Sequence, residues 1–456
     1  MKKIICLVLS LLFVAIAMCV YVFLSPLMPI ITGYPAKNLA SAVFVSERDV
    51  DSAKVIDLSF SPIKFTSKSV NYEEKSVTAR FLWAKSKAVY REDVGVVLLR
   101  GDDEDKKEAM TEKLPIVKRY SYDADTVDWP MGDVMPEQRG ISEQAAQKLD
   151  SISNSCFADG YGGTRFSLMV LHKGVPVLES YKDGINEDTK LLSWSMAKSV
   201  VNAMVGVKVG DGDMDVYAPA DVDDWKDDDR AAITLDDLMR MQSGLEWNEN
   251  YGNESDVNLM LHAEKDMAEF VYEKPLVVEP GKDFVYSSGS TNLVSYLIRK
   301  NIACDSTYYD LAYNRLLGRI GVQDPVLETD MSGTLVGSSY FYMTTRDYAR
   351  FGLLYLQDGV FNGERILPEG WVEYTTTPSI ASKGSYGSFF WTNKSGFGKN
   401  YLKDAPQDLF SCNGHDGQFI FVIPSEDLVI VTLGFSHKPN ELDKNRLVSD
   451  IIYALK

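Results

Sequence analysis

The 456-residue sequence is poor in the residues that build disulfide frameworks and metal sites, with five cysteines and four histidines. Cys6 and Cys19 lie in an apolar N-terminal run, whereas Cys156, Cys304 and Cys412 are isolated and no C-x-x-C pair occurs. This odd, dispersed count carries no zinc signature and no disulfide framework, although one bridge among the last three cysteines stays open. No two histidines have metal-ligand spacing, so we expect neither a metal nor another cofactor.

The sequence also lacks an excess of positive charge. Its formal net charge is −18 and its pI is about 4.8, which argues against a basic surface for nucleic acid. Hydrophobic residues make up 45% and charged residues 25%, the balance of an ordinary globular protein with a large core. No repeat recurs at a fixed period, so repeat architectures are not expected.

One long apolar run is present, at the N-terminus. Lys2 and Lys3 precede Ile4 to Leu24, which contains no charged residue. Twenty-one residues rise about 1.5 Å each in a helix, enough to cross the hydrocarbon core of a bilayer. The two lysines favour a cytoplasmic N-terminus. We therefore expect residues 1–25 to be a single-pass anchor in a bacterial inner membrane, with the rest of the chain on the periplasmic, extracytoplasmic side. Secretion after cleavage of a signal peptide is the alternative, although a signal peptide usually has a shorter apolar region.

The next part of the chain, residues 26–130, contains two alternating segments, "SVTARFLW" and "AVYREDVGVVLLRG". Such alternation is typical of strands and of a hairpin. We expect a β-rich N-terminal segment that either packs against the remaining chain or separates it from the membrane.

Residues 131–456 place strand patterns at both ends and mostly helical patterns between them. The expected elements are a helix over about 143–157 capped by Ser142, a hairpin around Lys173-Gly174, a helix from Ser195 to Val209, a helix capped by Thr234, two strands around Pro424–Asp427, and a last helix capped by Asn440. This order predicts an α+β domain in which one antiparallel sheet is built from both ends and covered by the terminal helices. A helical lobe would lie beside it, with a cleft between the two.

The stretch "LLSWSMAKSV" places Ser195 three residues before Lys198 at the start of a predicted helix. Side chains at i and i+3 share one helix face, so a neutral lysine there can take the proton of the serine hydroxyl. The free N–H groups of the first turn can hold an oxyanion. A second S-x-x-K, Ser61 to Lys64, lies in a region that we expect to be extended, where the two side chains would point apart. A capping serine and a solvated lysine are the alternative reading of the Ser195 pattern.

Two further elements lie downstream. "PGKDFVYSSGSTNL" puts Tyr286 just before a helix, where its hydroxyl could relay protons if nearby cations lower its pKa. In "CNGHDGQFIFVIP", His415 precedes an apolar strand and could supply a cation or a hydrogen bond. Gly417 would allow a ligand close to the backbone, and the N–H of Gln418 would be a second oxyanion donor. Trp391 and Tyr386 could line the pocket or be packed aromatics.

In this order, the Ser-x-x-Lys, Tyr and His-x-Gly elements resemble the penicillin-recognising serine hydrolases, the superfamily of serine β-lactamases and D-alanyl-D-alanine peptidases. The likeness is to its class C β-lactamase-related branch, with its carboxylesterases and 6-aminohexanoate-dimer hydrolases. It extends to "LHKGVPVLESY", "ITLDDLMRMQSGLEWNENY", "GSSYFYMTTRDYARFGLLYLQDGVFNGERILPEGWV" and "GHDGQFIFVIPSEDLVIVTLG", over roughly residues 140–456. The resemblance implies a β-lactamase/transpeptidase-like fold for residues 131–456.

The resemblance also implies a role for each element. Ser195 would be the acylated nucleophile, Lys198 its base, and Tyr286 the hydroxyl that passes the proton to the leaving group. His415 and Gly417 would form the third motif, and the N–H groups of Ser195 and Gln418 the oxyanion hole. The reaction would be acyl-enzyme formation followed by attack of water on a small ester, amide or peptide-like substrate.

The sequence departs from the β-lactamase pattern at two motifs. The second motif is Tyr286-Ser287-Ser288 instead of Tyr-x-Asn, so Ser288 offers no amide NH₂ to a substrate carbonyl. The third is His415-Asp416-Gly417 instead of Lys-Thr-Gly, and a histidine is a weaker carboxylate anchor than a lysine. A neutral ester or amide is therefore expected. The alternatives are a β-lactamase, a D-alanyl-D-alanine carboxypeptidase, or a non-catalytic, membrane-tethered binding relative.

Overall fold

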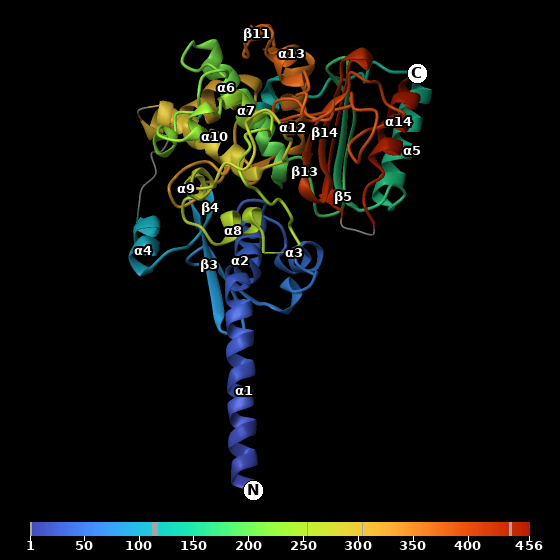
Figure 1. Ribbon diagram of the computed structural model, residues 1–456. Coiled ribbons are helices and arrows are strands. Elements are labelled where there is room, and N and C mark those ends of the chain that lie inside the picture. Colours follow the sequence, from blue (N-terminus) through green and yellow to red (C-terminus); the bar gives the residue numbers. More distant parts are fainter. Residues whose placement is uncertain (1, 112–116, 253, 303, 437–439) are drawn as a thin grey trace.

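The computed structural model describes residues 2–456 apart from 112–116, 253, 303 and 437–439 (Figure 1). One histidine, His437, thus lies outside the described residues. The α-helices are α1 (Lys2–Leu24), α2 (Met28–Phe44), α3 (Val50–Asp57), α4 (Asp103–Thr111), α5 (Glu143–Phe157), α6 (Ala197–Gly210), α7 (Leu235–Met239), α8 (Asp256–His262), α9 (Met267–Tyr272), α10 (Ser288–Asn301), α11 (Asp305–Asp310), α12 (Thr345–Leu356), α13 (Trp371–Thr376) and α14 (Lys444–Leu455).

In the described part of the chain the strands form four sheets. They are β1 (Ser67–Asn71), β2 (Ser76–Phe81), β3 (Ala84–Arg91), β4 (Gly95–Leu98), β5 (Thr164–His172), β6 (Val175–Tyr181), β7 (Leu191–Leu192), β8 (Val326–Leu327), β9 (Phe341–Met343), β10 (Val360–Phe361), β11 (Glu364–Arg365), β12 (Trp391–Thr392), β13 (Phe410–Gly414), β14 (Gln418–Ile423) and β15 (Leu428–Phe435).

The largest sheet has six antiparallel strands in the order β12-β13-β14-β15-β5-β6. Ile430 of β15 pairs with Val170 of β5, so segments 260 residues apart lie side by side. Alternate residues face opposite sides of a strand. Val170 and Ile430 accordingly pack in the cluster under α5 and α14, whereas Met169 and Val431 belong to the larger core with α12. The predicted antiparallel sheet, built from both ends and covered by the terminal helices, is confirmed.

Most of the helices between β6 and β12 form a lobe beside this sheet (Figure 1). Helix α6 lies deep within it, because every residue from Ala197 to Lys208 is buried. Short helices with good caps surround it. Thr234 caps α7 as expected, and its hydroxyl accepts the Asp237 N–H in a capping box.

The segment from residue 26 to 130 holds more helix than the β-rich prediction allowed. Strands β1 to β4 form an antiparallel meander, but α2 packs across it and α3 and α4 flank it. The sequence predicts no helix here because Gly33 and Pro35 favour turns locally. Burial of most of α2 against the sheet outweighs the local cost of the internal proline.

This N-terminal segment packs against the rest of the chain. Lys37 of α2 pairs with Glu328, and both side chains are buried. The other carboxylate oxygen of Glu328 accepts the Ser41 hydroxyl and the Val96 N–H, each at 2.8 Å. One carboxylate thus joins α2 and β4 to the lobe, and the segment is a docked part of the body.

Two local expectations are wrong, and one possibility that the sequence left open is now decided. Ser61 to Lys64 form a turn that leads into a 3₁₀ helix at Ile63–Phe65, not an extended strand. The last helix is capped by Asp443, whose carboxylate accepts the Arg446 N–H, and not by Asn440. Cys156, Cys304 and Cys412 are all free, so the bridge that the sequence left open does not form.

Helix α1 extends away from the body (Figure 1), and its apolar side chains are exposed along its length. It is long and apolar enough to cross a membrane or to act as a signal sequence. Helix α2 follows after one 3₁₀ turn at Ser25–Leu27, so the body begins directly at the end of α1.

Candidate active site

The site is built around Ser195, in the 3₁₀ turn Trp194–Met196 that leads into α6. Trp194 holds a φ of 45°, in the left-handed region that disfavours a bulky side chain. The turn is fixed from behind by a bond of 2.8 Å from the Ser193 N–H to the Phe341 carbonyl. A Cβ at Gly414 of β13 would meet the Ser193 carbonyl oxygen at 2.3 Å, so glycine is needed there. Strained backbone and close packing together hold Ser195 at the start of α6.

Lys198 lies directly beneath Ser195. Its ammonium nitrogen donates to the Ser195 hydroxyl at 3.0 Å, to the Ser288 hydroxyl at 2.9 Å and to the Ser338 carbonyl at 3.1 Å. The side chain is fully buried, and this burial lowers the pKa of Lys198 to about 8, although Glu249 opposes the shift. The neutral amine in contact with the serine hydroxyl is therefore far more populated near neutral pH than that of a solvated lysine.

Tyr286 stands on the other side of Ser195, at the end of the loop before α10. Its ring stacks on Trp391 with centroids 5.3 Å apart and meets Tyr386 edge-on at 5.8 Å. The Lys198 nitrogen lies 5.0 Å from the ring centroid. The condition that the sequence analysis set for a proton relay, a pKa lowered by nearby cations, is not met. Burial and the Glu249 charge raise the pKa of Tyr286, against the opposing effect of its hydrogen bond with Ser195. Tyr286 is held as a phenol that can donate a proton.

An acidic residue that the sequence analysis did not identify, Glu249, completes this network. Its carboxylate accepts the Ser288 hydroxyl at 2.5 Å and the Ser288 N–H at 2.9 Å. It also accepts from the Trp247 indole at 2.6 Å and from the Tyr251 hydroxyl at 3.1 Å. Ser288 is thus fully buried, bonded to Lys198 on one side and to Glu249 on the other. The only signal in the sequence was an acidic residue between aromatics in "EWNENY", which has no fixed spacing to Ser195.

The third element forms a tight turn between β13 and β14. Asp416 and Gly417 have φ values of 57° and 85°, and the left-handed Gly417 conformation favours glycine. The His415 ring stacks on Tyr251 with centroids 4.7 Å apart and meets Trp194 edge-on at 5.5 Å. Its Nε2 lies 3.3 Å from an Asp416 carboxylate oxygen. His415 is thus positioned over the start of α6.

The Gln418 side chain is structural. Its amide donates to the Gly434 carbonyl at 2.6 Å and its oxygen accepts the Gly434 N–H at 2.9 Å. Any contact of Gln418 with a ligand must therefore come from its backbone.

A pocket of about 680 Å³ opens over these groups, and we call it the Ser195 pocket. Its lining includes five of the predicted residues, Ser195, Tyr286, Trp391, His415 and Gly417. Lys198, Ser288 and Gln418 lie behind the lining. The sequence did not predict the contributions of Tyr251, Asn250, Lys399 and Lys444 to the wall.

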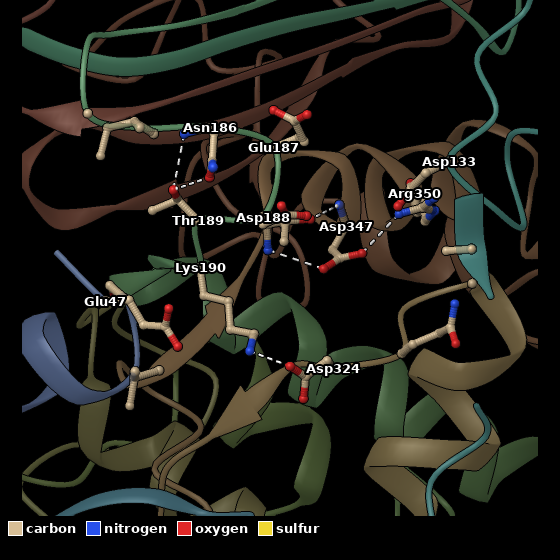
Figure 2. Close-up of a pocket in the computed structure, with 18 residues that line it drawn as sticks. Glu47, Asp133, Asn186, Glu187, Asp188, Thr189, Lys190, Asp324, Asp347 and Arg350 are labelled. Atoms are coloured by element: carbon tan, nitrogen blue, oxygen red, sulfur yellow. Dashed lines mark hydrogen bonds and ion pairs between the residues drawn. The ribbon is translucent and has the colours of Figure 1, made fainter. Parts of the chain in front are cut away.

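A second polar cavity, of about 770 Å³, lies elsewhere on the body (Figure 2). All the basic side chains in its lining are paired with carboxylates: Lys190 binds Asp324, and Arg350 binds Asp133 and Asp347. Such satisfied ion pairs are typical of structural contacts, and Ser195 is not in its wall. Among the described residues, no three His, Cys, Asp or Glu side chains gather to hold a metal ion. The Ser195 pocket is the better candidate for chemistry.

Comparison with known proteins agrees with this geometry. The Beta-lactamase family model matches residues 157–452. A 6-aminohexanoate-dimer hydrolase of Paenarthrobacter ureafaciens is 23% identical over 311 residues, which is 63% of this chain and 76% of that protein.

Solved structures share the fold. A putative 6-aminohexanoate-dimer hydrolase from Bacillus anthracis has a TM-score of 0.54 at 22% identity, covering 77% of this chain and 93% of that one. A family VIII carboxylesterase has a TM-score of 0.51 at 16% identity, covering 69% of this chain and 98% of that one. The family model spans well over half of the sequence. The chain therefore belongs to the Beta-lactamase family, and it is a serine hydrolase.

Proposed function

We propose that Ser195 is acylated by an ester or amide substrate and that water then releases the acyl group. The observation that carries this proposal is the 3.0 Å hydrogen bond between the Ser195 hydroxyl and Lys198, whose pKa burial lowers to about 8. A base with a pKa near the working pH is well suited to activate a serine, and here it already touches the hydroxyl.

In the first step, neutral Lys198 takes the Ser195 proton as the serine oxygen attacks the carbonyl carbon. The N–H groups of Ser195, at the start of α6, and of Gln418, at the start of β14, would hold the oxyanion. Tyr286 would give its proton to the departing alcohol or amine and recover one from Lys198. Its raised pKa supports this role, because the phenol stays protonated until the leaving group needs it.

In the second step, a water molecule in the Ser195 pocket attacks the acyl-enzyme. Lys198 and Tyr286 accept its proton and return one to the Ser195 oxygen. The Glu249–Ser288 pair supports both steps, because it fixes the Lys198 nitrogen and moderates the drop in its pKa.

We propose a neutral ester or amide as the substrate. His415 stands where an anionic β-lactam would need a lysine, and Asp416 places a carboxylate beside it. The named relatives, a 6-aminohexanoate-dimer hydrolase and a carboxylesterase, cover one amide and one ester activity. A β-lactamase or a D-alanyl-D-alanine carboxypeptidase is the second candidate, because the fold and Ser195-x-x-Lys198 suit both.

We also propose that α1 anchors the enzyme in a bacterial inner membrane, with the body on the extracytoplasmic side. The support is the length and apolar surface of α1, together with Lys2 and Lys3 before it. Secretion after signal cleavage is the alternative. An intact mass that retains residues 1–25, in a fraction that resists alkaline extraction, supports the anchor. A mass that begins beyond α1 contradicts it.

A substrate panel tests the reaction. Wild type, Ser195→Ala and a control, Ser449→Ala on α14, are assayed with p-nitrophenyl esters, short amides and nitrocefin. We expect turnover of esters or amides by wild type and the control, and none by Ser195→Ala. Turnover of nitrocefin above that of every ester would favour the β-lactamase alternative. Turnover by Ser195→Ala equal to that of wild type would exclude Ser195 as the nucleophile.

A further inference from the structure

A large cavity adjoins the Ser195 pocket on the side of α1. It has a volume of about 880 Å³, and we call it the apolar groove. Aliphatic and aromatic side chains dominate its lining, which is formed by Val22, Phe23, Pro26, Leu27, Ile30, Ile31, Tyr34, Phe60, Ser61, Pro62, Ile63, Tyr251, Gly252, Glu254, Asn258 and His415. Apolar cavities of this size favour hydrocarbon over water.

The groove and the Ser195 pocket share three residues, Tyr251, Gly252 and His415. The rings of Tyr251 and His415, stacked on each other, thus contribute to the walls of both cavities. Tyr251 is held in place by the bond from its hydroxyl to Glu249, the same carboxylate that binds Ser288. A ligand in the groove therefore ends beside the groups that surround Ser195.

The opposite end of the groove is formed by the last turn of α1. Val22 and Phe23 are exposed there, at the C-terminal end of the apolar run. Tyr21 contacts Trp83 at the tip of the β2–β3 hairpin, with ring centroids 5.0 Å apart. Tyrosine and tryptophan gather at membrane–water interfaces. If α1 spans a bilayer, the Tyr21–Trp83 contact lies at the membrane surface, and the mouth of the groove lies at the same level.

The protein surface near the mouth of the apolar groove has the composition expected of a surface in contact with a membrane. Phe65 and Leu82 are each 65% exposed, beside the groove and at the hairpin tip respectively. Residues 60–90 contain six basic and two acidic residues, in a chain whose net charge is −18. Exposed apolar side chains with neighbouring positive charge are typical of a surface that rests on an anionic membrane.

We infer that the substrate of the proposed acyl transfer is a membrane-resident amphiphile, an ester or amide with a long hydrocarbon chain. The hydrocarbon chain of the substrate enters the groove from the bilayer along α1, and the substrate carbonyl group reaches Ser195 past Tyr251 and His415. The hydrocarbon moves from one apolar environment to another, so it need not pass through water. This inference rests on the proposed function and names the substrate class for the same site.

The test compares chain lengths on the full-length protein in mixed micelles. Wild type is assayed with p-nitrophenyl acetate and p-nitrophenyl dodecanoate. Ile30→Trp fills the groove, and Leu27→Gln makes its wall polar with a smaller change of volume. Val55→Trp is the matched control, because Val55 is exposed on α3 and does not line the groove. Thermal unfolding of each variant shows whether it has folded.

We expect wild type and Val55→Trp to prefer the dodecanoate at least tenfold in kcat/KM. That preference should fall at least tenfold in Ile30→Trp or Leu27→Gln, whichever folds. Equal kcat/KM for both esters in wild type, or an unchanged preference in a folded groove variant, overturns the inference. In that case hydrolysis of the acetate still supports the proposed function, and the groove serves only as a packing surface for lipid or for a second copy of α1. If wild type turns over neither of these esters nor the short amides of the substrate panel, both the proposed function and this inference are overturned.

Discussion

Glu249 reaches Lys198 through a single hydroxyl group, that of Ser288. The lysine donates to this hydroxyl at 2.9 Å, and the hydroxyl donates to the carboxylate at 2.5 Å. The buried Lys198 amine therefore interacts electrostatically with the Glu249 carboxylate without a direct ion pair between them. Burial lowers the pKa of Lys198 to about 8, and Glu249 limits the decrease. Two predictions follow from this arrangement.

The first concerns pH. In the proposed mechanism neutral Lys198 is the base, and the neutral fraction of its amine grows as the pH rises through its pKa. We expect kcat/KM for a neutral ester to fall as the pH drops below about 8, with one apparent pKa that belongs to the coupled network. A kcat/KM that is flat from pH 6 to 9, with chemistry shown to be rate-limiting, would contradict this role.

Glu249→Gln should shift the fall of kcat/KM, which wild type shows below about pH 8, to lower pH. The substitution keeps an oxygen acceptor for the Ser288 hydroxyl but removes the charge that raises the Lys198 pKa. The control is Glu246→Gln, three residues earlier on the exposed surface. If the pH at which kcat/KM falls is unchanged in Glu249→Gln, or is higher than in wild type, Glu249 does not act on Lys198 through its charge.

Lys198→Met should lower kcat/KM by about 10²–10⁴, the usual contribution of a general base. We expect the melting temperature to stay at or above that of wild type, because a costly buried amine is replaced by an apolar chain. Lys208→Met, on the same helix but paired with Asp213 at 2.6 Å, is the control and should retain turnover. Turnover by Lys198→Met at the wild-type rate would exclude it as the base.

Tyr286→Phe removes only the hydroxyl and keeps the ring contacts with Trp391 and Tyr386. We expect a fall of at least about 10² in kcat with little change in melting temperature, because proton delivery to the leaving group is lost. The loss should be larger for esters of poor leaving groups than for p-nitrophenyl esters, which need less proton transfer. Equal losses for both would point to a packing role.

Gly414→Ala tests how the nucleophile is positioned. The new Cβ would meet the Ser193 carbonyl at 2.3 Å, so β13 or the Ser195 turn must move. Misplacement by about 1 Å can cost 10²-fold in rate, and we expect a loss of that order in kcat/KM. Gly210→Ala is the control, since its Cβ would meet Pro368 only at an ordinary contact distance of 3.6 Å. A Gly414→Ala enzyme with wild-type kcat/KM would show that the close approach is not needed.

The sequence predicted the main sheet because its signal is local. Strands β5, β14 and β15 are runs of apolar residues bounded by turns, and the caps of α5 and α7 are single serine and threonine residues. Ser195, Tyr286 and His415 were singled out because the Ser-x-x-Lys, Tyr and His-x-Gly elements follow one another in a recognisable order, and all three line one pocket.

What the sequence did not reveal depends on distant contacts. Glu249 gains its place only because the loop after α7 folds against the start of α10. The pKa of Tyr286 rises because of burial and of Glu249, neither of which has a local signature. Helix α2 forms despite Pro35 because it buries its surface on a sheet whose strands come later in the chain.

Labelling by a fluorophosphonate probe, followed by peptide mass analysis, tests the central claim most directly, because the probe reacts with an activated serine whatever the substrate. We expect one label on wild type at Ser195, none on Ser195→Ala, and strongly slowed labelling of Lys198→Met. Labelling of Ser195→Ala at another serine, or no labelling of folded wild type, would contradict the proposal that Ser195 is the nucleophile activated by Lys198.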